Sequence, residues 1–135
     1  MCRGSSEKIK CESRSMKTLI LGATPNPSRY AFIASGMLLE YGHEIVPVGI
    51  RSGKVSGVQI LDLKQRPMVD AVDTITMYVG KKNQPIWYDY LISLKPRRII
   101  FNPGAENYEF EQLATANGIE TIQACTLVML RTGQY

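Results

Sequence analysis

A glycine and several polar residues follow the first short apolar segment of the chain. Residues Thr18–Leu21 favour a strand, and Asn26-Pro27 is a typical helix start, because asparagine caps helices and proline suits their first turn. A strand that turns into a helix in this way directs backbone N–H groups and a helix N-terminus at one point, which suits a phosphate group. The turn offers such contacts from Gly22, Ala23, Thr24, Asn26 and Arg29.

This turn nearly matches the dinucleotide-binding pattern G-x-G-x-x-G. Gly22 holds the first glycine position, but Thr24 and Pro27 occupy the second and third. The second glycine normally lets the backbone approach a pyrophosphate closely, and Thr24 adds a side chain there. Pro25 and Pro27 also lack N–H donors. We therefore expect a phosphate held partly by side chains; a stiff loop without a ligand is the alternative.

The end of the second expected strand carries cations where nicotinamide-binding proteins carry an acid. NAD-type proteins use Asp or Glu there to bond the ribose hydroxyls, and no acid lies between Ile45 and Gly57. Arg51 and Lys54 occupy this segment instead and suit a phosphorylated ribose. The 2′-phosphate of NADP and the 3′-phosphate of coenzyme A (CoA) both fit this chemistry, and two solvated loop cations are the alternative.

A third polar segment is formed by Asn102, Pro103, Gly104 and Glu106, between a strand and a helix. Gly104 favours a tight turn or a close approach to a ligand. Glu106 is the single acid that we place near the site, and it also suits a helix N-terminus. His43 is expected at the opposite end from Cys125, so no nucleophile–base pair is indicated. We predict no catalytic residues and no metal ligands, and binding rather than catalysis.

Alternating strand and helix patterns must position these segments. They predict an α/β protein with a Rossmann-like, doubly wound parallel sheet in three layers, with strand order 3-2-1-4-5 and a sixth strand as an extension. The site loops then meet at the carboxyl edge of the sheet. The first helix is expected to bury Tyr30, Ile33, Ala34, Met37, Leu38 and Tyr41. The expected strands are Thr18–Leu21, Ile45–Val48 with Pro47 at an end or a bulge, Val58–Leu61, Thr74–Val79, Arg98–Phe101 and Ile119–Gln123.

Length and composition fit one soluble domain. The chain has 135 residues, 44% of them hydrophobic, and three cysteines without a C-x-x-C pair, which favours a reducing cytoplasm. Of the 16 basic and 12 acidic residues, four and two lie in residues 1–15, so the remainder is nearly neutral and no broad nucleic-acid surface is expected. No segment is long and apolar enough for a membrane span. We expect residues 1–15 to be a flexible extension and residues 16–135 to be a single domain.

Five segments resemble the CoA-binding domain family, the free-standing relatives of the CoA-binding domain of the succinyl-CoA synthetase α subunit. They are Leu21–Arg29, Gly42–Gly49, Val72–Val79, Phe101–Glu106 and Ala124–Leu130. The resemblance implies a Rossmann-type fold that binds CoA or an acyl-CoA. It places the pyrophosphate on Gly22, Ala23, Thr24, Asn26 and Arg29, the adenosine end beside Pro47 and Val48, the 3′-phosphate near Arg51 or Lys54, and the pantetheine arm or rim near Asn102, Pro103, Gly104 and Glu106.

Three interpretations follow from these observations. The first is non-catalytic binding of CoA or acyl-CoA, a small-molecule partner, without nucleic acid or membrane. The second is an NADP-binding oxidoreductase or redox-sensing module, which Arg51 and Lys54 permit. The third is a protein interaction module with a vestigial cleft, in which Tyr88 and Tyr108 mark a partner surface. A homodimer is compatible with each.

Overall fold

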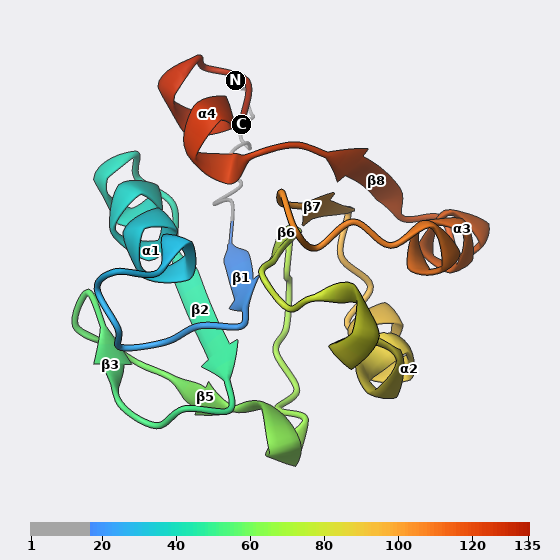
Figure 1. Ribbon diagram of the computed structural model, residues 1–135, viewed down its shortest axis with the longest axis horizontal. Coiled ribbons are helices and arrows are strands. Elements are labelled where there is room, and N and C mark those ends of the chain that lie inside the picture. The colour runs from blue at the N-terminus through green and yellow to red at the C-terminus, as the bar shows by residue number, and fades with distance from the viewer. Residues whose placement is uncertain (1–16) are drawn as a thin grey trace, which may run out of the picture.

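The computed structural model describes residues 17–135, and six of its strands form one parallel sheet (Figure 1). The expectation for residues 1–15 lies outside the described residues. The strand order is β5-β2-β1-β6-β7-β8, which confirms the Rossmann-like α/β class. The strands are β1 (Thr18–Leu21), β2 (Ile45–Gly49), β5 (Leu61–Asp62), β6 (Thr74–Met77), β7 (Arg98–Phe101) and β8 (Glu120–Gln123).

The third strand differs from the sequence prediction in one detail. Val58–Leu61 was expected to be one edge strand, but β4 (Val58–Gln59) pairs with β3 (Lys54–Val55) in a separate antiparallel hairpin. The sheet edge is β5, which pairs with β2 at two positions, Val48↔Leu61 and Gly49↔Asp62. Along the chain, this hairpin therefore lies between β2 and the edge strand β5.

Two helices cover each face of the sheet. Figure 1 shows α1 (Tyr30–Glu40) and α4 (Thr126–Arg131) on one side, and α2 (Tyr88–Ser93) and α3 (Tyr108–Ala116) on the other. Successive side chains of β1 point to opposite faces of the sheet and so belong to two hydrophobic cores. Ile20 packs with α1 and α4, while Leu19 and Leu21 pack with α2 and α3. Short 3-10 turns lie at Leu63–Gln65, Lys81–Asn83 and Pro85–Trp87.

The start of α1 differs from the prediction, and its buried face is confirmed only at Ala34 and Leu38. Asn26 does not cap the helix: its side-chain oxygen accepts the Ser28 N–H at 3.0 Å, and its carbonyl accepts the Arg29 N–H at 3.1 Å, which closes a turn before the helix begins at Tyr30. The helix buries Ala31, Ala34, Ser35 and Leu38. Tyr30 and Tyr41, expected in the core, are 70% and 50% exposed.

Pro47 lies inside β2, not at its end. It faces Ile20 of β1 in the register, and the Val48 carbonyl accepts hydrogen bonds on the β1 side. Alternation of the backbone turns the Pro47 nitrogen toward β5, and β5 pairs with β2 only from Val48 onward. The missing N–H of Pro47 therefore removes no hydrogen bond from the β1–β2 ladder.

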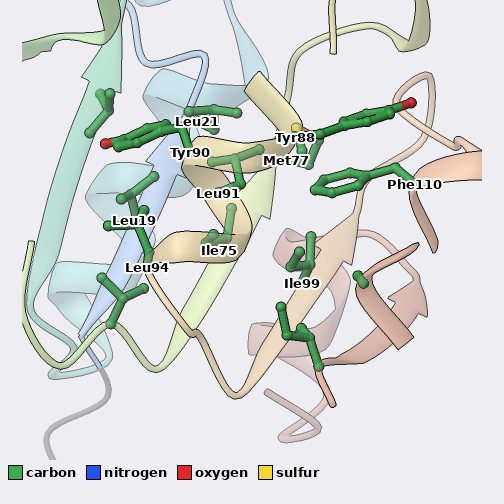
Figure 2. Packing of buried hydrophobic residues seen from close by; sticks show 14 of the residues in the cluster. Leu19, Leu21, Ile75, Met77, Tyr88, Tyr90, Leu91, Leu94, Ile99 and Phe110 are labelled. Carbon is green, nitrogen blue, oxygen red and sulfur yellow. The ribbon is translucent and has the colours of Figure 1, made fainter. Parts of the chain in front are cut away.

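Aromatic rings fill the core under α2 and α3 (Figure 2). Tyr88 stacks on Phe110 with ring centroids 4.4 Å apart, and Phe110 meets Phe101 edge to face at 5.9 Å. Tyr88 is 9% exposed and its hydroxyl accepts a hydrogen bond from Asn107 at 2.8 Å. The expectation that Tyr88 marks a partner surface is wrong, whereas Tyr108 is 73% exposed.

Candidate functional site

A cavity of about 970 Å³ lies at the carboxyl ends of β1, β2 and β6. This volume is at the upper end of the range for small-molecule sites, so it suits a ligand as large as a dinucleotide. Of the predicted site residues, Gly22, Ala23, Thr24, Asn26, Arg29, Arg51 and Pro103 line it. The prediction that loops from separate strands meet at this edge is confirmed by this lining.

Close backbone contacts position the loop after β1. Gly22 has φ +99°, and a Cβ there would lie 3.2 Å from the carbonyl carbon of Tyr78 and 3.3 Å from Val79 Cγ2. A Cβ on Gly49 would lie 2.3 Å from the Ala23 carbonyl oxygen. The N–H groups of Gly22 and Ala23 both donate to the Val48 carbonyl, at 2.9 and 3.1 Å. The ends of β1 and β2 are therefore in direct backbone contact.

The loop uses most of its own N–H donors. Ala23 donates to Val48, Asn26 to the Thr24 hydroxyl at 3.2 Å, and Ser28 and Arg29 to Asn26. These bonds rigidify the loop and leave the first turn of α1 facing the cavity. Arg29, the N-cap residue, makes no side-chain cap hydrogen bond, and the first turn contains no acid, so the positive helix end is free for an anion.

Three cations and no acid line the cavity. Arg29, Arg51 and Lys82 contribute to its wall, and none of them forms an ion pair within residues 17–135. Lys54 lies on β3, outside this lining, because the hairpin turns the chain away after Arg51. The positive potential of the site thus comes from Arg51 rather than Lys54 at the β2 end.

Four further predicted residues, Pro47, Val48, Gly104 and Glu106, do not line the cavity. Pro47 and Val48 are buried in β2. Gly104 and Glu106 are exposed beyond the cavity lining and are joined by a 2.9 Å hydrogen bond from the Gly104 N–H to the Glu106 carboxylate.

Asn102 is 2% exposed and makes three internal hydrogen bonds. It donates to the Thr76 hydroxyl at 2.7 Å and to the Met77 carbonyl at 2.9 Å, and accepts the Thr126 N–H at 2.9 Å. Its amide is thus engaged within the fold and connects β6, β7 and the start of α4.

A second amide network, which the sequence does not reveal, holds the opposite wall. Gln84 is fully buried and donates to the Val79 carbonyl at 2.9 Å and to the Ala105 carbonyl at 2.8 Å. Its oxygen accepts from Asn107 at 2.9 Å, and Asn107 also donates to Tyr88. The segment after β6 is therefore tied to the segment after β7, and both border the cavity.

This wall also supplies the lining residues that sequence reasoning missed. None of the site residues predicted from the sequence lies between Lys54 and Asn102, so Pro85 and Trp87 were not among them. Pro85 and Trp87 line the cavity with Ile86 and with residues of the strand end before them, which are Tyr78, Val79, Gly80, Lys82 and Asn83. Other elements contribute Tyr30, Ala31, Gly49, Ile50 and Leu63 to the lining. Pro85, Ile86 and Trp87 follow the β6 strand at the carboxyl edge of the sheet, and this position is the one signal that could have indicated them.

Titratable groups near the cavity are poorly placed for proton transfer. Burial raises the pKa of Tyr78 to about 12, so its hydroxyl stays protonated at neutral pH. His43 lies at the other end of the sheet, 4.8 Å from the Tyr135 ring, and burial together with Arg98 lowers its pKa. Cys125 precedes α4 and does not line the cavity. In residues 17–135 no group of three or more His, Cys, Asp or Glu side chains could hold a metal ion.

No helix in the described part of the chain is long and apolar enough to cross a membrane.

Comparisons with known proteins agree with this geometry. A solved structure described as an uncharacterized protein is 49% identical, with a TM-score of 0.87, and the match covers 91% of this chain and all of that one. A hypothetical protein from Pyrococcus horikoshii OT3 (23% identity, TM-score 0.77, 88% and 84% covered) and a protein of Thermus thermophilus (20%, 0.78, 90% and 91%) share the fold. No curated protein matches the chain.

The family assignment comes from a sequence profile that spans nearly the whole described chain. The profile of the CoA binding domain matches residues 16–131 and so includes every strand of the main sheet and all the residues that line the cavity. The chain belongs to the CoA-binding domain family.

Proposed function

We propose that this protein binds CoA or an acyl-CoA in the cavity at the carboxyl edge of the sheet, without chemistry of its own. The observation that carries the proposal is the combination of an uncapped α1 N-terminus with Arg29 and Arg51 in a wall that contains no acid. Such a wall matches a ligand with several phosphates. Family membership makes CoA the first candidate among such ligands.

The pyrophosphate is assigned to the first turn of α1. Helix N-termini bind phosphates through free N–H groups and the positive end of the dipole. Arg29, directly before the helix, adds a charged donor on the same side. Thr24 and Asn26 shape the approach, since they brace the loop by hydrogen bonds with its own backbone.

The 3′-phosphate of the adenosine is assigned to Arg51. It follows β2, where dinucleotide folds receive the ribose, and it lines the cavity with Ile50. CoA and dephospho-CoA differ by this phosphate alone, so their affinity ratio isolates the contact. The 2′-phosphate of NADP would reach the same guanidinium, which keeps NADP as the competing ligand.

Isothermal titration calorimetry with CoA, dephospho-CoA and NADPH tests the proposal. We expect CoA to bind more tightly than NADPH. Arg51→Gln should lower the CoA to dephospho-CoA affinity ratio about 5- to 20-fold, near the lower end of the effect of a hydrogen bond between charged groups because Arg51 is exposed. Lys54→Gln, a matched loss of charge outside the cavity, should leave that ratio within about twofold. Absence of CoA binding at millimolar concentration would refute the proposal, and tighter binding of NADPH would favour the NADP alternative.

A further inference from the structure

The two ends of the cavity differ in chemistry. Arg29 and Arg51 lie on the side of α1 and β2, whereas the opposite wall beyond β6 consists of Lys82 and Asn83 followed by the apolar residues Pro85, Ile86 and Trp87. Ile86 is 64% exposed although it is a large apolar side chain. Apolar surface gains free energy when a ligand removes it from water, so this wall favours an apolar group.

The polar contacts set the direction of a bound CoA, and this step rests on the proposed function. With the pyrophosphate at the start of α1 and the 3′-phosphate at Arg51, the adenosine occupies the β2 end. The other arm of the ligand, which ends in the thioester, then crosses β1 toward Val79 and the Pro85–Trp87 turn. The acyl group therefore arrives at the apolar wall.

We propose that Ile86 and Trp87 form a subsite for an uncharged, apolar acyl chain, so that the ligand class is acyl-CoA with a short aliphatic acyl group. The side chains that line this end between Val79 and Trp87 are mostly apolar. They are backed by the Gln84 network, which holds their segment against Ala105. A rigid wall of this kind presents Ile86 to the ligand without a reorganisation cost.

A carboxylated acyl group is disfavoured at the same wall. The Arg66 guanidinium lies 4.8 Å from the centre of the Trp87 ring and donates to the Ile86 carbonyl at 3.4 Å, so it is engaged in holding the turn. Lys82 lines the cavity beside the apolar part of this wall, but its ammonium is a strongly hydrated single charge on a flexible stem, which holds a carboxylate less firmly than the planar Arg51 guanidinium holds a phosphate. A terminal carboxylate would have to lose water against Ile86 without a buried partner.

Butyryl-CoA and succinyl-CoA provide a matched pair, because both acyl groups have four carbons and differ in a terminal methyl or carboxylate. We expect butyryl-CoA to bind about 3- to 10-fold more tightly than CoA, as for burial of two to three carbons at a partly open wall. Succinyl-CoA should bind no more tightly than CoA. Tighter binding of succinyl-CoA than of butyryl-CoA, or equal binding of butyryl-CoA and CoA, would overturn the proposal.

Two isoleucines of equal exposure locate the subsite. Ile86→Asn should bring the butyryl-CoA to CoA affinity ratio close to one. Ile50→Asn, at the opposite end of the cavity and 66% exposed in the wild type, should leave that ratio unchanged. Both side chains are on the surface, so both variants should fold. Loss of the ratio in Ile50→Asn rather than in Ile86→Asn would show that the ligand lies in the reverse direction and overturn the assignment.

Trp87 is the single tryptophan of the chain and reports directly on this wall. Its emission should shift to shorter wavelength when butyryl-CoA is added and change less with CoA, since the acyl chain displaces water from the ring. Unchanged emission at saturating butyryl-CoA would contradict the subsite. Failure of both CoA and butyryl-CoA to bind in calorimetry would refute the proposed function as well, whereas CoA binding without an acyl preference refutes only this inference.

Discussion

Replacement of Gly49 by alanine tests how the end of β2 positions the loop after β1, which we propose binds phosphate. Gly49 is buried and has a strand conformation, so alanine is compatible with its backbone angles. The obstacle is space: the new methyl carbon would lie 2.3 Å from the Ala23 carbonyl oxygen, and 3.2 Å from the Ala23 carbonyl carbon and nitrogen. An ordinary contact needs about 1 Å more, and the atoms in the way belong to backbone, which cannot rotate aside.

The loop after β1 must therefore move away from β2. That movement strains the two hydrogen bonds from Gly22 and Ala23 to the Val48 carbonyl. Overpacking of this kind costs about 2 kcal/mol, within the usual 1–3 kcal/mol. For a chain of this size we expect a Tm lower by about 8 °C. The first turn of α1 and Arg29 move with the loop, so CoA affinity should fall about tenfold or more.

Gly80→Ala is the matched control. Gly80 has φ −65°, and a Cβ there would meet no atom within 4 Å, although the residue also lines the cavity. Its Tm should stay the same or rise slightly, because alanine restricts the unfolded chain. Thermal unfolding by circular dichroism and calorimetric titration with CoA measure both effects. A Gly49→Ala protein with a Tm within about 2 °C of the wild type and with unchanged CoA affinity would refute the argument that this contact positions the loop.

Two further predictions concern the stability of the fold. Asn102→Ala removes three buried hydrogen bonds and leaves the Thr126 N–H and the Met77 carbonyl without their side-chain partner. The free energy of unfolding, measured by urea denaturation, should therefore fall by about 3 kcal/mol. A loss below about 1 kcal/mol would contradict the role of Asn102 as a connector. Burial raises the pKa of Asp73, but hydrogen bonds from Arg97 and Thr74 and the charges of Arg97 and Arg98 outweigh it, so the net pKa is lowered. The Asp73 contribution to stability is therefore fully present above the pKa of the unfolded aspartate, about 3.9. It is lost as the pH falls through the lower folded-state pKa. Asp73→Asn should flatten this acid limb in urea titrations at successive pH values, and an equally steep limb in the variant would contradict it.

The order of the sheet could be predicted because its strands are short apolar segments separated by helical patterns. Thr18–Leu21 and Arg98–Phe101 have the bounds that the sequence indicated. Right-handed crossovers then leave few ways to order such strands. The edge was harder to predict, since Lys54–Gln59 contains a glycine turn between two valines and forms its own hairpin before β5 joins the sheet.

The buried face of α1 could not be read from periodicity alone. Tyr30, Ile33 and Tyr41 repeat at helical spacing, but the side that packs on the sheet carries Ala31, Ala34 and Ser35. Small residues permit a close approach of helix and sheet, and a hydrophobic pattern gives the bulky residues more weight. The distance between α1 and the sheet is a property of the assembled layers, and it favours burial of the face with small residues over burial of the neighbouring face with Tyr30 and Tyr41.

The site residues divide in the same way between local and long-range causes. Gly22 and Arg29 are positioned by the turn in which they lie, so their sequence was informative. The position of Lys54 outside the cavity depends on the β3–β4 hairpin. The burial of Asn102 depends in part on a hydrogen bond with Thr126, 24 residues away at the start of α4. Gln84 and Asn107 lie 23 residues apart, and no sequence pattern indicates the hydrogen bond between their amide side chains.

These long-range hydrogen bonds of amide side chains make the walls of the cavity rigid, which affects the conformational freedom lost when a ligand binds. Gln84 joins the Val79 and Ala105 carbonyls, and the Val48 carbonyl joins the loop after β1 to β2, so opposite walls are each held by buried hydrogen bonds. The side chains that we propose contact the ligand, Arg51 and Ile86, are by contrast exposed, and Arg51 has no ion-pair partner in the described residues. A rigid backbone frame with free side chains loses little conformational freedom on binding except in those side chains. Substitutions in the frame should therefore lower stability and affinity together, whereas substitutions at Arg51 or Ile86 should alter ligand preference at nearly constant Tm.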